Sequence, residues 1–88
     1  MNTRKIERVV KGFSNHRRIQ ILSLLEEKPT LSVFSISDEL GVNFKTISEH
    51  LRRLTLAGLV EKHSRGSAVE HSLSDLGRRV LKFSRTLE

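Results

Sequence analysis

The chain has 88 residues, the size of one small domain with no room for a second. Hydrophobic residues make up 36% and charged residues 30%, and 16 Lys and Arg against 10 Asp and Glu give a net charge of +6. This balance is typical of a compact domain with a charged surface and favours a polyanionic partner. No segment is long and apolar enough to span a bilayer, so we expect no membrane insertion.

Cysteine is absent, which excludes disulfides, a thiolate nucleophile and thiolate metal ligands. The basic start Met1–Lys5 lacks the apolar core of a signal peptide, so the expected location is the cytoplasm. Neither a glycine-rich phosphate loop nor a G-x-S-x-G turn occurs. We therefore expect no catalytic residues, no bound cofactor and no enzymatic activity.

Two helices are predicted in the first third of the chain. The first covers about residues 3–12, where apolar side chains recur at helical spacing between basic ones. The second follows a cap at Ser14–Asn15 and continues to Glu27, and Pro29 prevents its extension. Its apolar face is broad, which is typical of a helix at the centre of a core, and consists of Ile19, Ile21, Leu22, Leu24 and Leu25.

A third and a fourth helix flank a short turn. Ser32 can cap the third, which carries Val33, Ile36 and Leu40 and stops at Gly41. Asn43 can cap the fourth, whose apolar stripe is Ile47, Leu51 and Leu54. The rest of the fourth helix is polar or basic. A helix, a turn and a helix of this type resemble a helix-turn-helix, although an ordinary amphipathic helix has the same pattern.

The pattern of the last third of the chain predicts two strands and a helix. Strands are predicted over residues 59–64 and 67–73, joined around Arg65–Gly66. The final helix covers residues 75–87 after a cap at Ser74. Gly77 lies inside this helix at a cost of up to about 1 kcal/mol relative to Ala, which only a close contact would explain.

The predicted fold class is mainly α with a small β-hairpin, in the order α-α-α-α-β-β-α. This order is that of a winged helix-turn-helix, here a single domain over residues 1–88. The terminal helices, about residues 3–12 and 75–87, each carry an apolar stripe that a symmetric homodimer would bury. The expected dimerisation residues are Ile6, Val9, Val10, Phe13, Leu76, Val80, Phe83 and Leu87.

Three segments resemble the ArsR-type family of winged-helix repressors. Residues 13–22, FSNHRRIQIL, are similar to that family's Leu-Ser-Asn/Asp-Pro-Thr-Arg run leading into Ile-Leu. Residues 41–54, GVNFKTISEHLRRL, are similar to its recognition segment, in which Thr-Val-Ser-x-His-Leu is typical. Residues 57–60, AGLV, match the run that leads into the wing. Residues 73–79, LSDLGRR, look more like the Leu-Thr-x-x-Gly step of the MarR and PadR groups.

The resemblance implies a dimeric transcriptional regulator that binds double-stranded DNA. Many family members sense metals through a Cys pair before the recognition helix, but residues 37–42 read SDELGV here. Others use acidic and His ligands on the last helix, which has Asp75 and Glu88 but no His. The usual Pro and Thr at the start of the second helix are His16 and Arg17. We therefore predict DNA binding without a metal site, and the sequence names no effector.

Short polar side chains at the start of a recognition helix read bases, whereas Lys and Arg neutralise phosphates. Glu49 can accept from a cytosine amino group, and Arg65 on the wing can reach a minor groove or a phosphate. Phe44 can touch a thymine methyl group or, equally well, only its neighbouring side chains. His50 is as readily a structural histidine. The residues predicted at DNA are Asn43, Phe44, Lys45, Thr46, Ser48, Glu49, His50, Arg52, Arg53 and Arg65.

Two alternatives remain at the level of the sequence. A winged helix can also serve as a protein–protein interaction module without direct DNA binding, and Glu49 and Phe44 fit that use slightly better. RNA binding is a third option.

His63 and His71 lie on the paired strands, but two histidines without a third ligand seldom bind zinc, so surface or half-buried histidines are favoured.

Overall fold

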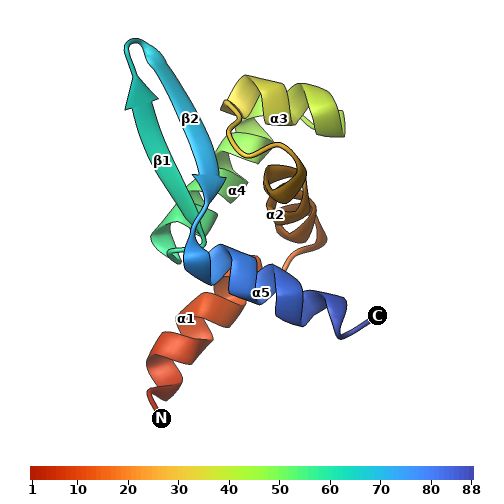
Figure 1. Cartoon of the computed structure of the whole chain (residues 1–88), viewed down its shortest axis with the longest axis vertical. Helices are drawn as coiled ribbons and strands as arrows, with labels where there is room; N and C mark the ends of the chain where they lie inside the picture. Colours follow the sequence, from red (N-terminus) through yellow and green to blue (C-terminus); the bar gives the residue numbers. More distant parts are fainter.

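The computed structural model describes residues 1–88 and contains five helices and one antiparallel hairpin (Figure 1). This architecture confirms the predicted winged helix-turn-helix. None of the helices has the length and hydropathy needed to cross a membrane. In chain order the elements are α1 (Thr3–Phe13), α2 (His16–Glu27), α3 (Val33–Leu40), α4 (Phe44–Leu56), β1 (Val60–Arg65), β2 (Ala68–Leu73) and α5 (Asp75–Arg85).

Every helix begins after a short polar residue whose side chain accepts a hydrogen bond from a free backbone N–H. The five caps are Asn2, Asn15, Ser32, Asn43 and Ser74. Asn43 Oδ1 accepts from Lys45 N at 2.8 Å, and Gly41 ends α3 at a φ of +63°. These two positions set the turn of the helix-turn-helix, because they stop α3 and start α4 within three residues.

The core forms around α2, as its broad apolar face predicts. Four of its residues are buried, and they pack with the buried stripe of α4 and with Ile36 of α3. Ile19 differs from the prediction, since 36% of its surface is exposed at the edge of the core. The fully enclosed large side chains are Ile21, Leu22, Leu25, Ile36, Ile47, Leu51, Leu54 and Leu59.

The hairpin turn lies one residue later than predicted. Arg65 is the last residue of β1 and pairs with Ala68, so the turn consists of Gly66 and Ser67. Gly66 has a φ of +63°, which glycine adopts without a steric penalty. At the other end of the hairpin, Leu31 and His71 exchange two backbone hydrogen bonds of 2.7 and 3.1 Å. This short bridge ties the base of the wing to the segment before α3.

The junction between β2 and α5 explains the glycine inside the last helix. Gly77 is buried, and a Cβ atom at this position would lie 2.1 Å from the carbonyl oxygen of Leu59. The cap residue Ser74 strengthens the same junction, because its hydroxyl donates to Gly58 O at 2.6 Å and accepts from Gly77 N at 2.9 Å. Helix α5 ends at Arg85, two residues earlier than predicted, so Leu87 lies beyond the helix.

Replacement of Gly77 by Ala should destabilise the domain by about 1–3 kcal/mol, the usual cost of overpacking a filled site. Helix propensity alone predicts the opposite sign, a gain of up to about 1 kcal/mol. Urea unfolding followed by circular dichroism at 222 nm measures the difference.

Lys82 is exposed on the same helix and provides the matched control. Lys82→Ala should change the free energy of unfolding by less than about 0.5 kcal/mol. A Gly77→Ala protein as stable as the wild type would contradict the close approach to Leu59.

Candidate nucleic-acid interface

Helix α4 turns one side inward and leaves the opposite side at the surface. Ile47, Leu51 and Leu54 are at most 2% exposed, which fixes the rotation of the helix about its axis. The structure therefore brings the predicted residues from 43 to 53 together around the start and outer side of α4. Of these predicted residues, the cap Asn43 and six residues of α4 are exposed, namely Phe44, Lys45, Thr46, Glu49, Arg52 and Arg53, whereas Ser48 and His50 are half-buried.

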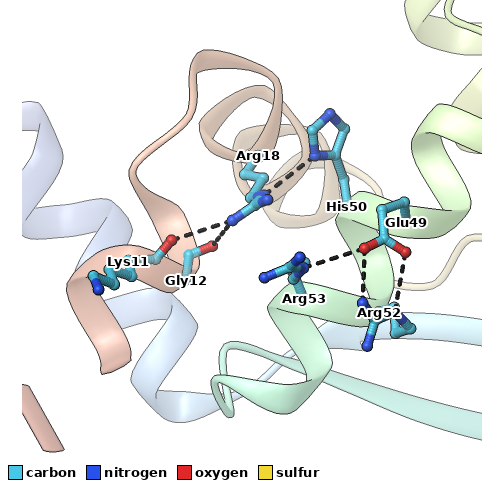
Figure 2. A network of polar contacts seen from close by, with 7 residues as sticks. All are labelled: Lys11, Gly12, Arg18, Glu49, His50, Arg52 and Arg53. Atoms are coloured by element: carbon cyan, nitrogen blue, oxygen red, sulfur yellow. Dashed lines mark hydrogen bonds and ion pairs between the residues drawn. The ribbon is translucent and has the colours of Figure 1, made fainter. Parts of the chain in front are cut away.

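Glu49 binds both arginines of this surface (Figure 2). Arg52 donates through Nε at 3.0 Å and through Nη2 at 2.8 Å, and Arg53 Nε donates at 3.2 Å. The hydrogen bonds from Arg52 and then Arg53 lower the pKa of Glu49 to about 2. Glu49 is therefore ionised at physiological pH and occupies guanidinium groups that face solvent. Its Oε2 atom accepts one of these three bonds and keeps a second lone pair, which a cytosine amino group could use.

A second polar contact, away from the exposed side of α4, joins this helix to α2 and α1. Arg18 of α2 donates through Nε to His50 Nδ1 at 3.2 Å and through Nη1 to the carbonyl oxygens of Lys11 and Gly12, at 3.1 and 3.4 Å (Figure 2). Partial burial and the charge of Arg18 lower the pKa of His50 below its usual 6.5. His50 thus acts as a neutral acceptor, which places it in a structural contact.

Sequence reasoning assigned no role to Arg18. Its partner on α4 lies 32 residues away, so no local spacing could reveal the pair. Gly12 reinforces the same contact, since a Cβ atom there would lie 2.4 Å from Cβ of Ala57. The end of α1 is therefore held against α4 by close packing and by Arg18.

The wing carries Arg65 at its far end. Its side chain is 85% exposed and lies 3.8 Å from a carboxylate oxygen of Glu70 on the neighbouring strand. The hairpin tip extends beyond the helices in Figure 1. Arg65 is thus an accessible cation, but it ends a strand and does not lie at the apex of the turn.

The two histidines of the hairpin do not converge. His63 pairs with Glu70 and His71 with Lys62, so their side chains point to opposite faces of the hairpin. His63 Nε2 lies 2.8 Å from Ser72 Oγ. His71 is 4% exposed, its Nδ1 has no partner, and burial lowers its pKa. No group of three or more His, Asp or Glu side chains could hold a metal ion.

The terminal helices expose part of the predicted dimerisation set. Ile6, Val10, Phe83 and Leu87 are 45%, 47%, 55% and 69% exposed. Val9, Phe13 and Leu76 are half-buried and pack on the chain's own core. Val80 is only 8% exposed, so the core holds it and no partner can reach most of its surface. An open groove of about 550 Å³ separates α1 from Leu76 and Arg79 of α5.

Comparison with known proteins identifies the family to which this arrangement of helices and hairpin belongs. The family model for bacterial regulatory proteins of the arsR family matches residues 15–62. The chain belongs to the ArsR family. The matched residues include the whole helix-turn-helix and the start of the wing, so the resemblance noted in the sequence is confirmed.

Two curated relatives are transcriptional regulators. An uncharacterized HTH-type transcriptional regulator of Methanocaldococcus jannaschii is 38% identical over 63 residues, which cover 72% of this chain and 71% of that protein. The transcriptional activator HlyU of Vibrio cholerae is 34% identical over 73 residues, 83% of this chain and 67% of that protein. This ArsR-family chain is accordingly a winged helix-turn-helix transcriptional regulator.

Solved structures share the same fold. The homodimeric winged helix-turn-helix DNA-binding domain of a possible ArsR-family regulator from Mycobacterium bovis superposes with a TM-score of 0.87 at 29% identity, over 97% of this chain and 79% of that chain. Reduced HlyU from Vibrio cholerae gives a TM-score of 0.83 at 30% identity, over 98% and 90%.

The lowered pKa values of His50 and His71 predict a loss of stability in acid. A histidine whose pKa is depressed on folding binds its proton in the unfolded state first. The free energy of unfolding should therefore be constant above about pH 6.5 and fall as the pH decreases towards the pKa of the folded state. Chemical denaturation between pH 7.5 and pH 5 measures this dependence.

His50→Gln should make the pH dependence shallower, because only His71 then contributes. Arg18→Met should also reduce it, since removing the cation raises the pKa of His50. The pH dependence of the free energy of unfolding in the Arg18→Met, His50→Gln double variant should match that of His50→Gln alone. If Arg18→Met left the pH dependence of the wild type unchanged, the contact between Arg18 and His50 would not govern the protonation of His50.

Proposed function

We propose that this regulator is a homodimeric repressor that binds a specific double-stranded DNA sequence and competes with RNA polymerase for a promoter. The observation that carries the proposal is the outward side of α4, where polar and basic side chains lie on a helix anchored by its buried stripe. A helix of this kind enters the major groove. The net charge of +6 supports a polyanionic partner, and a DNA-binding regulator acts in the cytoplasm.

The residues divide by their chemistry. Asn43, Lys45, Thr46 and Ser48 supply donors and acceptors near the start of α4, where base edges are read. Arg52, Arg53 and Arg65 are exposed cations suited to phosphates. Glu49 forms hydrogen bonds with two of these arginines. His50 accepts a hydrogen bond from Arg18, which holds it in a structural position.

The dimer is proposed from the exposed apolar surface of the terminal helices. Ile6 and Val10 on α1 and Phe83 and Leu87 at the end of the chain are exposed, and α1 and α5 lie in the same half of the molecule (Figure 1). Ile6 and Val10 line a groove together with Leu76 of α5. Isolated exposed apolar residues are ordinary, but a cluster on two neighbouring elements marks an interaction surface. The similar domain from Mycobacterium bovis is described as homodimeric, which supports the same assembly here.

Replacing Arg52 and Arg65 together by Ala should weaken binding to any duplex, because both side chains are assigned to phosphates. The slope of log affinity against log salt should fall by about 1 for each lost phosphate contact. Fluorescence anisotropy with a labelled duplex between 50 and 300 mM KCl measures affinity and slope.

Lys82→Ala removes a cation of α5 outside the proposed interface and should leave the slope unchanged. Glu49→Gln should act in the opposite direction, with about threefold to tenfold tighter binding at low salt, because it removes a negative charge facing DNA and frees two guanidinium groups. Unchanged duplex affinity in the Arg52→Ala, Arg65→Ala protein would refute the DNA-binding proposal. Retention of a protein partner at high salt would then favour an interaction module.

Val10→Asp should give a monomer, because it places a charge in the proposed apolar dimer surface. A monomer engages one half-site, so affinity for a palindromic site should fall by about 100-fold or more. Sedimentation velocity measures the assembly state, and anisotropy measures the affinity.

Phe34→Ser is the matched control, since it removes an exposed apolar side chain outside the terminal helices. It should leave the dimer intact in sedimentation. A Val10→Asp protein that still sediments as a dimer would place the symmetric interface elsewhere on the molecule.

A further inference from the structure

Two aromatic rings lie together at the surface, beside the start of α4. Phe44 is 47% exposed and Phe34 is 73% exposed. Their ring centroids are 6.1 Å apart and their planes are inclined by 55°, which is a common geometry for interacting aromatic side chains. Exposed single hydrophobic residues need no explanation, but a contacting pair in a basic domain of 88 residues forms a distinct apolar patch.

The patch is continuous with the proposed reading surface. Phe44 is the first residue of α4 and lies between the cap Asn43 and the exposed Lys45. Phe34 belongs to the first turn of α3, which Figure 1 places at the end of the molecule away from α1 and α5. The proposed dimer surface is therefore separate, and a second copy of the chain bound through the terminal helices would leave the two rings uncovered.

The position of Phe44 limits what it can contact. Residues at the start of a recognition helix face base edges in the major groove. A phenyl ring has no hydrogen-bond donor or acceptor, so it cannot distinguish bases through the polar code. The C5-methyl group of thymine is the apolar group that base pairs present in that groove, and apolar side chains contact it.

We propose that Phe44 selects thymine by packing on its C5-methyl group at one position of each half-site. Phe34 is the positioning residue, because its ring contacts that of Phe44 and limits the orientations that Phe44 can adopt. This inference rests on the proposed DNA-binding function and adds a base preference to it. Neighbouring Thr46 is the competing side chain, since it carries a methyl group and is also exposed at the start of α4.

The test begins with a duplex site selected by the wild-type protein from a random library. Each thymine of the half-site is replaced by deoxyuridine, which lacks only the C5-methyl group. At one position the wild type should lose about fourfold in affinity per half-site, the effect of failing to bury one methyl group. Fluorescence anisotropy at fixed salt measures the ratio of the two affinities.

Phe44→Ala should bind thymine and deoxyuridine duplexes equally at that position, whereas Phe44→Leu should keep part of the preference. Phe34→Ala should reduce the ratio, and Phe34→Leu should restore part of it. Thr46→Ser, the matched control, should keep the fourfold ratio of the wild type. Thermal unfolding of each variant shows that it is folded.

Two results would overturn the inference while leaving DNA binding intact. One is a wild-type protein that binds its selected site without preference for thymine over deoxyuridine at any position. The other is a preference that survives in Phe44→Ala and disappears in Thr46→Ser. A wild-type protein that selects no duplex at all would instead refute the proposed function, and the thymine contact with it.

Discussion

The buried stripe of α4 is the constraint on which the rest of the structure depends. Ile47, Leu51 and Leu54 fill the core beside α2, and burying each large side chain stabilises the fold by about 1.5–3 kcal/mol. Rotating α4 by one residue would expose these side chains and bury polar ones together with Arg52 or Arg53. The core therefore fixes which side chains of the helix face solvent, and the outward polar surface follows from the same seven-residue pattern that builds the interior.

The sequence predicted most of this arrangement because the deciding signals are local. Periodicity identified the helices, Asn43 and Gly41 marked the turn between α3 and α4, and the alternation along β2 identified the wing. Gly77 was recognised as unfavourable in its helix, but only the approach of the Leu59 carbonyl explains it. Where contacts join distant segments, as in this junction, spacing along the chain carries no information.

The candidate site shows the same division. Side chains such as Lys45 and Thr46 could be placed on the outer side of α4 from periodicity alone. The contacts of Glu49 with Arg52 and Arg53 are also local, at spacings of three and four residues, but the prediction from the sequence did not include them. The contact of Arg18 with His50, 32 residues away, could not be found from spacing. Val80 shows a related difficulty, since an apolar stripe does not reveal whether the chain's own core covers a position, as it covers most of Val80 here.

Arg18 connects the helix proposed for dimerisation, α1, with the helix proposed for DNA binding, α4. Its guanidinium bonds to carbonyl oxygens at the end of α1 and to His50 on α4, and Gly12 packs against Ala57 at the same place. The helix proposed to contact a second copy is thereby held to the helix proposed to contact DNA, with no flexible linker between them. In a symmetric pair, the angle between the two copies of α1 would then set the separation of the two α4 helices. Because half-sites lie about 34 Å apart on one face of a duplex, small changes at the terminal helices would suffice to move both reading helices out of register.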